Sequence, residues 1–360
     1  MNFFKKRLEK IKLSLIQNNL DGILINNLTN IRYISGFSGS SATCLVFDKK
    51  EYFISDGRYK LQAKIEVENM DIIIENDTAL NIIKKQKFLK NKKLKLGFEA
   101  NQINYNQFQE LKLMFPEIHW VPIKNVIENI RKTKDEKEIE YIRNAAEITD
   151  EAFDQIIPDL RIGLSEIEIS AKISFALKIL GADEDAFRPI IAGGPNSALP
   201  HAFPTKRELK KGDFLILDFG AKYKGYHADM TRTVVIKECN EKQKEIYSIV
   251  HDSQILGIEN ITNNNECKQI DGVCRGHINS LGYKDNFIHN TGHGLGLEIH
   301  EDPRFSPNSK EKIYNNYIMT VEPGIYIPNF GGVRIEDDII VKNTNSEILN
   351  KSTKDLIVID

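Results

Sequence analysis

Apolar and polar residues follow one pattern over roughly the first third of the chain. Over the first twenty residues, Phe4, Leu8, Ile11 and Leu15 recur at helical spacing and form one apolar face. Short apolar runs bounded by polar turns then predict strands over residues 22–25, 43–47, 52–55 and 94–98, and a helix over about residues 106–114. Strands that alternate with helices predict a small α/β domain.

The pattern changes near residues 125–134, where we place a boundary between two domains. The first domain covers residues 1–127 and the second covers residues 128–360. Apolar residues at helical spacing follow the boundary, with Thr133 or Asp135 as the N-cap. A chain of 360 residues suits two domains, since ~150 residues per domain is a usual prior.

Capping signals and short apolar runs organise the second domain. Ser165 and Glu168 form a capping box, and Gly181 ends the helix that this box begins. Further helices are predicted over residues 241–258 and 267–279, and strands over residues 213–219, 232–236, 289–293, 297–300, 319–326 and 333–341. The second domain is therefore predicted to consist of helices packed on a mostly antiparallel sheet. We assign the whole chain to the α/β (α+β) class, since helices and strands occur in both domains.

Composition and charge argue against several classes of function. Lys and Arg number 49 and Asp and Glu number 51, whereas a nucleic-acid or membrane-surface partner would favour a basic excess. No segment approaches the ~20 apolar residues of a membrane span, and the first twenty residues lack the apolar stretch of a secretory leader. The four cysteines form no CxxC pair, so we expect reduced thiols, a cytoplasmic location and no cysteine-based zinc site.

Four acidic residues lie in apolar segments, where a carboxylate is costly unless it is paired or bound to a metal. Asp218 ends the apolar strand within FLILDFG, and Asp229 follows in HADMTRT. Glu322 interrupts IMTVEPGIY, and Glu336 interrupts GGVRIEDDIIV. Taken singly, each is most simply interpreted as a satisfied core acid. Four in one domain, together with the run HNTGHGLGLEIH, instead predict a metal site.

Histidines supply the nitrogen atoms for such a site. His293 and His289 lie four residues apart in a glycine-rich segment, and glycines let a strand approach a metal closely. We expect His293 to be the ligand and His289 to contact the substrate or support the site. His300 lies further along the same segment, and His201 lies in a loop, where a lone histidine is usually just exposed.

Four carboxylates and one imidazole suit two divalent ions, because two carboxylates can bridge and four negative charges offset four positive ones. An oxygen-rich ligand set favours Mn²⁺, with Co²⁺, Zn²⁺ or Fe²⁺ as alternatives. Two ions ~3.5–4 Å apart hold a hydroxide between them and polarise a scissile carbonyl. We therefore expect two divalent metal ions as cofactors.

The chain resembles the aminopeptidase P, prolidase and methionine aminopeptidase superfamily in the order and spacing of four runs: LDFGAKYKGYHADMTRT, HNTGHGLGLEIHEDP, VEPGIY and GGVRIEDD. The resemblance implies a pita-bread catalytic domain with two pseudo-symmetric halves. Two earlier runs, NIRYISGFSGSSATCLVF and ISDGRYKLQA, resemble the creatinase-type, RNase H-like N-terminal domain of the proline-specific branch. Methionine aminopeptidases lack that domain, so the resemblance favours Xaa-Pro peptidases.

The resemblance also implies which residues bind metal. Asp218 binds one ion, His293 and Glu322 bind the other, and Asp229 and Glu336 bridge both. All five positions hold the expected residue type. This speaks against creatinase, a relative that has lost the metals.

The remaining roles implied by the resemblance concern the substrate and the reaction. His300 hydrogen-bonds the substrate near the scissile carbonyl and helps to stabilise the tetrahedral intermediate. His289 and His201 line the substrate site and shuttle protons or orient the peptide. Arg334 supports the site or meets a substrate carboxylate. Glu322 accepts a proton from the bridging hydroxide and delivers it towards the proline nitrogen.

Three functions stay open at this point. The first, which the runs GSSATCLV and SDGRY favour, is a homodimeric Xaa-Pro aminopeptidase that acts on peptides with proline in the second position. The second is a prolidase, which takes only dipeptides, and Arg334 does not decide between the two because both branches have an equivalent arginine. The third is a catalytically inactive binding protein on the same fold, which the complete ligand set disfavours.

Overall fold

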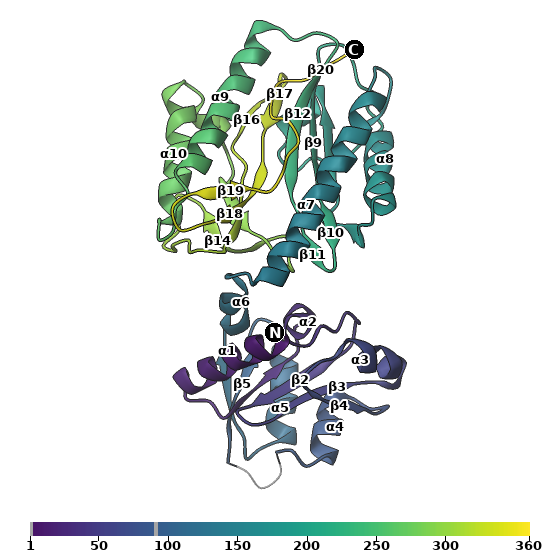
Figure 1. Ribbon diagram of the computed structural model, residues 1–360, viewed down its shortest axis with the longest axis vertical. Helices are drawn as coiled ribbons and strands as arrows, with labels where there is room; N and C mark the ends of the chain where they lie inside the picture. The colour runs from purple at the N-terminus through teal and green to yellow at the C-terminus, as the bar shows by residue number, and fades with distance from the viewer. Residues whose placement is uncertain (1–2, 90–92) are drawn as a thin grey trace. The chain divides into compact units, whose positions relative to one another are not determined.

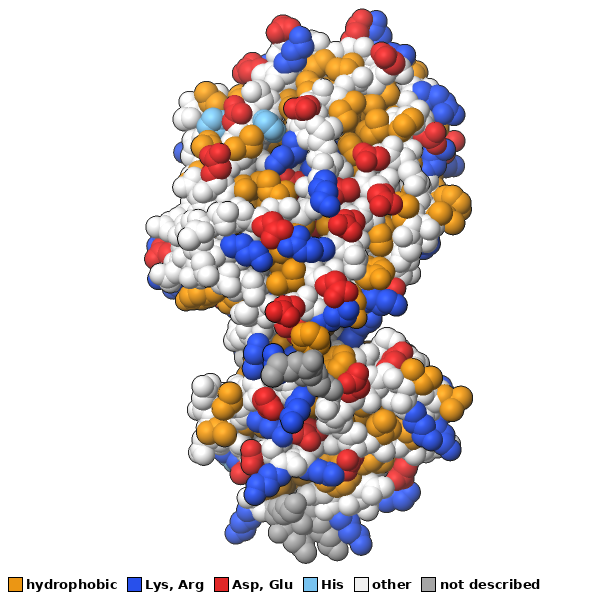
Figure 2. Space-filling model, in the orientation of Figure 1, with side chains coloured by type: hydrophobic (Ala, Val, Ile, Leu, Met, Phe, Trp, Pro, Cys, Tyr) orange, Lys and Arg blue, Asp and Glu red, His pale blue; other side chains and the backbone are white. Residues whose placement is uncertain are grey.

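A computed structural model of the protein describes residues 3–89 and 93–360. The chain forms two compact units, unit 1 over Met1–Arg131 and unit 2 over Lys132–Asp360. On the visible face of each unit, basic and acidic side chains are interspersed (Figure 2). Among the described residues, no helix is long and apolar enough to cross a bilayer.

Unit 1 is built on a six-stranded sheet in the order β4-β3-β2-β1-β5-β6. Its strands are β1 (Gly22–Ile25), β2 (Thr43–Phe47), β3 (Glu51–Ser55), β4 (Asp71–Ile74), β5 (Lys95–Glu99) and β6 (His119–Ile123). Strand β1 pairs antiparallel with β2 and parallel with β5, so the sheet is mixed. Apolar residues of the strands and helices, among them Leu45, Leu96 and Trp120, are buried in one core.

The helices of unit 1 lie against this sheet (Figure 1). They are α1 (Phe3–Gln17), α2 (Leu28–Ser35), α3 (Lys60–Glu66), α4 (Ala79–Lys85), α5 (Tyr105–Met114) and α6 (Val126–Arg131). The predicted strands, the first helix and the helix over residues 106–114 are confirmed. Helix α2 was not predicted, although Asn27 caps its first turn and Gly36 ends it with a φ of 85°.

Two pairs of helices enclose the sheets of unit 2 (Figure 1). The helices are α7 (Glu136–Ile156), α8 (Glu166–Ile179), α9 (Glu241–Glu259) and α10 (Cys267–Ser280). Helix α7 packs against α8, and α9 packs against α10. Asp135 rather than Thr133 caps α7, and Ser165 caps α8 as predicted.

The larger sheets of unit 2 have the strand orders β20-β12-β9-β8 and β14-β13-β15-β18-β19, and smaller sheets join β11-β10-β7 and β16-β17. The strands are β7 (Glu184–Asp185), β8 (Ile190–Gly193), β9 (Phe214–Phe219), β10 (Ala221–Tyr223), β11 (Tyr226–His227), β12 (Met230–Ile236), β13 (Gly292–Gly294), β14 (Glu301–Phe305), β15 (Ile318–Val321), β16 (Gly324–Ile327), β17 (Gly331–Arg334), β18 (Asp337–Val341), β19 (Ser346–Ile348) and β20 (Val358–Ile359). Pairing in the two larger sheets is antiparallel except between β12 and β20, as a mostly antiparallel sheet predicts. An isolated bridge between Thr231 and Glu336 connects these two sheets.

Four predicted strands of unit 2 were wrong in their extent, and one of them, residues 289–293, is strand only from Gly292 onwards. Residues 319–326 divide into β15 and β16 at Glu322, because the following Pro323 has no backbone N–H for a ladder. Residues 333–341 divide at Glu336, whose N–H donates to Thr231 in the other large sheet. Residues 297–300 form bends instead of a strand, because the N–H of Gly296 closes a local turn onto the Glu298 carbonyl.

Candidate metal centre

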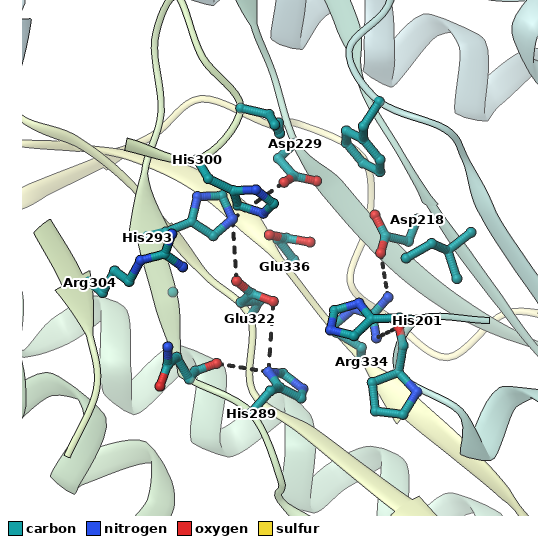
Figure 3. Close-up of a pocket in the computed structure, with 16 residues that line it drawn as sticks. His201, Asp218, Asp229, His289, His293, His300, Arg304, Glu322, Arg334 and Glu336 are labelled. Carbon is teal, nitrogen blue, oxygen red and sulfur yellow. Dashed lines mark hydrogen bonds and ion pairs between the residues drawn. The ribbon is translucent and has the colours of Figure 1, made fainter. Parts of the chain in front are cut away.

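A cavity of about 210 Å³ in unit 2 brings together every residue that the sequence predicted for the site. Its walls include His201, Asp218, Asp229, His289, His293, His300, Glu322, Arg334 and Glu336 (Figure 3). Phe187 also lines the cavity.

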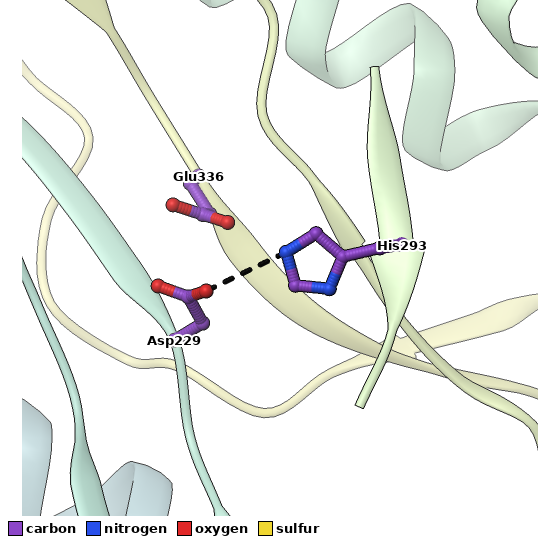
Figure 4. A group of neighbouring side chains, drawn as sticks. All are labelled: Asp229, His293 and Glu336. Carbon is purple, nitrogen blue, oxygen red and sulfur yellow. Dashed lines mark ion pairs between the residues drawn. The ribbon is translucent and has the colours of Figure 1, made fainter. Parts of the chain in front are cut away.

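Three of these side chains converge most closely. One ligand atom each of Asp229, His293 and Glu336 lies within 4.8 Å of the others (Figure 4). The Nε2 atom of His293 is 3.6 Å from Oδ2 of Asp229 and 3.5 Å from Oε1 of Glu322. Asp218 stands outside this group, and its carboxylate pairs with the Arg334 guanidinium.

Thr231 of β12 fixes the spacing between the acids. It lies opposite Asp218 in the pairing of β9 with β12, so the two side chains share a face of the sheet. Its hydroxyl donates to Glu336 at 2.6 Å and accepts from Nε of Arg334 at 3.1 Å. The backbone N–H of Asp229 donates to Asp338 at 3.0 Å. The acids are therefore held by neighbours that belong to both large sheets.

His293 presents an unprotonated nitrogen to the cavity. Its Nδ1 atom lies 3.0 Å from the Gly294 carbonyl, which only accepts, so Nδ1 carries the proton. Burial, together with the nearby His300 and Arg304, lowers the pKa of His293 to about 3 and keeps the ring neutral. Nε2 then has a free lone pair directed at the carboxylates, which is the form of histidine that binds metals.

The four carboxylates repel one another inside a buried site. Burial and the charges of Glu336 and Asp218 raise the pKa of Asp229, and burial and the charge of Glu322 raise the pKa of Glu336. Burial also raises the pKa of Asp218, against the lowering effect of Arg334, and that of Glu322 to about 7. A cation that binds here relieves both the repulsion and the cost of burial.

Unpaired oxygen atoms test whether these residues suit a metal. Oδ1 of Asp218, Oδ1 of Asp229 and Oε1 of Glu336 are buried and have no hydrogen-bond partner among the described residues. Buried polar atoms normally have a partner, so three orphaned oxygens in one cavity need an explanation. Carboxylate oxygens beside one imidazole nitrogen are the donor set of hard or borderline divalent ions. The donor set formed by these residues therefore fits a divalent metal ion.

A chain of hydrogen bonds links two other predicted residues. Tyr326 accepts from Nη1 of Arg334 at 2.7 Å, and its hydroxyl lies 2.8 Å from Nε2 of His289. Nδ1 of His289 donates to the Asn290 carbonyl at 2.8 Å, so Nε2 accepts the Tyr326 proton. Burial and the charge of Arg334 lower the pKa of His289 to about 3, which favours this neutral form.

Sequence reasoning missed Tyr326 and Arg304. Tyr326 ends the run VEPGIY, and its position four residues after Glu322 was the available signal. Arg304 lines the cavity and lies opposite His293 in the pairing of β13 with β14. Side chains of paired residues share one face of a sheet, so the pairing explains why Arg304 points into the cavity (Figure 3).

An α/β unit, followed by a unit whose two sheets and helix pairs surround buried acids, is the architecture of a pita-bread metallopeptidase. The chain matches the model of the creatinase/prolidase N-terminal domain over residues 7–133 and that of metallopeptidase family M24 over residues 140–343. The chain therefore belongs to metallopeptidase family M24. This confirms the family resemblance, the fold class and the assignment as a hydrolase.

Relatives of similar length support this placement. The Xaa-Pro dipeptidase of Pyrococcus horikoshii is 36% identical over 367 residues, which cover 99% of this chain and 100% of the relative. A solved Xaa-Pro dipeptidase from Bacillus anthracis has a TM-score of 0.95 at 37% identity and covers 99% of each chain. A solved X-Pro aminopeptidase from Thermotoga maritima has a TM-score of 0.90 at 33% identity and covers 98% of this chain and 99% of its own.

Proposed function

We propose that the protein hydrolyses the Xaa-Pro bond with two divalent ions, and that Xaa-Pro dipeptides are its preferred substrates. Asp218, Asp229, His293, Glu322 and Glu336 would hold the ions, and Asp229 and Glu336 would bridge them. The observation that carries this proposal is the convergence of Asp229, His293 and Glu336 beside three orphaned carboxylate oxygens. When bound, such ions lower the pKa of a water molecule and polarise a carbonyl group.

The surrounding residues would manage the protons and the developing charge. Glu322 takes a proton from the attacking water and delivers it to the proline nitrogen as the C–N bond breaks. His300 donates a hydrogen bond to the carbonyl oxygen while that oxygen gains negative charge. His201 lines the cavity and contacts the peptide. The Arg334–Tyr326–His289 chain keeps His289 in one tautomer beside Glu322, whose Oε2 is 3.8 Å from Nδ1.

Arg304 favours dipeptides over longer peptides. It faces the cavity and forms no hydrogen bond or ion pair with the described residues, whereas the other arginine there, Arg334, is held by Asp218. An unpaired guanidinium is suited to bind a carboxylate in a bidentate manner, such as the free carboxylate of a proline. The cavity of about 210 Å³ also lies below the ~300–1,000 Å³ of typical ligand pockets, so it suits a small substrate.

This ranking, with dipeptides before longer peptides as substrates, differs from the preference for longer peptides that the sequence suggested. Relatives named Xaa-Pro dipeptidase support the change. Cleavage of longer peptides stays the second candidate, because the X-Pro aminopeptidase from Thermotoga maritima covers the same length of chain. Mn²⁺ is the ion that we propose first, and a cytoplasmic homodimer is the expected form.

A panel of three substrates tests the proposal. With Mn²⁺ present, we expect rapid hydrolysis of Ala-Pro and slow hydrolysis of Ala-Pro-Ala and Ala-Pro-amide, which lack a carboxylate on proline. Arg304→Leu should raise KM for Ala-Pro by roughly tenfold or more, since charged hydrogen bonds contribute ~1.5–3 kcal/mol, whereas Arg304→Lys should retain part of the preference. Equal rates on all three substrates would favour the aminopeptidase, and hydrolysis of none would refute the proposed function.

A further inference from the structure

The ring of His300 is positioned by the backbone that carries it and not by hydrogen bonds of the ring itself. Neither ring nitrogen of His300 forms a hydrogen bond with the described residues. The ring packs edge-on against His293, with the ring centroids 4.5 Å apart and an interplanar angle of 74° (Figure 3). The direction of the His300 side chain therefore depends on the loop between β13 and β14 that carries it.

Glu301 closes the turn that contains His300. Its carboxylate Oε1 accepts the backbone N–H of Glu298 at 3.2 Å, so one side chain joins the two ends of the turn. Gly296 leaves room for that carboxylate, because a Cβ atom at this position would lie 2.9 Å from Oε1. On the other side of the loop, the N–H of His227 donates to the Gly296 carbonyl at 2.9 Å.

Lys134 supplies the charge that keeps this carboxylate in place. Its Nζ atom is 3.0 Å from Oε2 of Glu301, and the two side chains are only 2% and 6% exposed. The backbone N–H of Lys134 donates to the Asn316 carbonyl, which anchors the lysine within unit 2. Removal of one partner from a buried ion pair is strongly destabilising, so the Glu301 carboxylate would leave its position without Lys134.

We propose that Lys134 is a positioning residue for catalysis, and that the buried Lys134–Glu301 ion pair fixes the turn that presents His300 to the substrate. The inference rests on the proposed function, in which His300 donates to the reacting carbonyl. Neither member of the pair lines the cavity. Loss of the pair should therefore lower kcat while KM and metal content stay close to their wild-type values.

Kinetics of paired variants test the proposal. With Ala-Pro as substrate, Lys134→Met should lower kcat by about ten- to a hundredfold, the cost of a small misplacement of a catalytic group, and Lys134→Arg should restore most of it. Lys132→Met is the control, because it removes a lysine of the same segment from a more exposed ion pair with Glu311, and its kcat should stay within about twofold of wild type. In a His300→Ala background, Lys134→Met should cause no further loss, and additive losses would overturn the proposal.

A double variant covers the case in which Lys134→Met folds poorly. Lys134→Met/Glu301→Gln removes both charges but keeps an oxygen that accepts from Glu298. It should regain part of the kcat that Lys134→Met loses. A kcat no higher than that of Lys134→Met, in a folded and metal-loaded protein, would contradict a role for the ion pair through this turn.

Histidine NMR separates this inference from the proposed function. Ring signals of the eight histidines can be followed in labelled protein, and His300→Ala identifies the His300 signal. We expect Lys134→Met to shift or broaden that signal and Lys132→Met to leave it unchanged. An unchanged His300 signal in Lys134→Met would overturn the inference, whether or not the wild-type protein cleaves Xaa-Pro.

Discussion

Buried carboxylates in the two units meet the cost of burial in opposite ways. In unit 1, Glu99 is 7% exposed, and its Oε2 atom accepts the backbone N–H groups of Asn26 and Asn27, each at 2.7 Å. Its Oε1 atom accepts Nδ2 of Asn30 at 2.6 Å. In unit 2, Asp229 and Glu336 are 5% and 2% exposed, yet each keeps one oxygen without a partner among the residues that the structure describes.

Asp337, the residue after Glu336, shows that the degree of burial does not distinguish the site acids from a structural acid. Asp337 is fully buried, but its carboxylate pairs with Arg232 at 2.7 Å and with Lys354 at 2.9 Å. Burial acts to raise the pKa of Asp337, and these two cations outweigh it and hold the pKa below its ordinary value. Donors or cations surround the carboxylates of Glu99 and Asp337, whereas Asp229 and Glu336 each keep a buried oxygen without a partner among the described residues. The proposed metal ions would supply that missing partner.

The largest expected effect comes from removing a site carboxylate. Glu336→Gln should lower hydrolysis of Ala-Pro by more than about a hundredfold, because loss of the proposed bridging ligand should exceed the 10- to 100-fold cost of losing a supporting partner. Glu99→Gln, the matching change in unit 1, should leave kcat within about twofold of wild type. Steady-state kinetics with metal analysis of both variants checks this pair. Equal losses would remove the distinction between the two kinds of buried acid.

Metal removal should affect the stability of one unit only. Ions at a free concentration of about 1,000 times their Kd stabilise the folded state that binds them by about 4 kcal/mol. A chelator should therefore increase hydrogen exchange in β9, β12, β15 and β18 of unit 2. Trp120, the single tryptophan, lies in β6 and reports on unit 1, so its fluorescence transition in urea should not move. A parallel loss of protection in both units would contradict the metal site as placed.

A smaller effect is expected from Glu99 itself. Glu99→Gln places an amide group beside N–H donors that need an acceptor, and an unsatisfied buried donor costs about 1–3 kcal/mol. The urea midpoint followed by Trp120 fluorescence should fall accordingly. Glu110→Gln, an exposed change in the same unit, is the control and should leave the midpoint unchanged. No shift in Glu99→Gln would show that its hydrogen bonds do not stabilise unit 1.

The smallest effect is a dependence on pH. Burial raises the pKa of Glu99 above its ordinary value of 4.5, so the folded protein holds this proton more tightly than the unfolded chain does. The stability that this proton contributes is present below pH 4.5 and is lost as the pH rises through the folded pKa. The stability difference between wild type and Glu99→Gln, read from Trp120, should therefore narrow from pH 4.5 upwards. A stability difference that widens as the pH rises would show that the folded protein does not hold the Glu99 proton more tightly than the unfolded chain does.

Local signals in the sequence predicted most of the fold. Ser165 and Gly181 marked the ends of α8, because caps and stops act within a few residues. Helix α2 was missed although Asn27 and Gly36 carried the same kind of signal. The division of residues 333–341 at Glu336 was not predicted, because it depends on the hydrogen bond to Thr231, a residue distant in sequence.

Site residues were predictable from the sequence where a charged residue interrupts an apolar run. Asp218 and Glu336 are acids in apolar runs, and both line the cavity. Lys134 and Glu301 break no local rule and lie 167 residues apart, so only the folded chain joins them. Arg304 follows a run rich in charge, and only its pairing opposite His293 reveals that it faces the site.

Anomalous diffraction from crystals grown with Mn²⁺ tests the central claim most directly. The orphaned oxygens of Asp218, Asp229 and Glu336 should each lie at bonding distance from a metal, with two peaks ~3.5–4 Å apart between Asp229 and Glu336. His293 and Glu322 should contact one peak and Asp218 the other. A single peak, or peaks away from these five residues, would contradict the account of a dinuclear site.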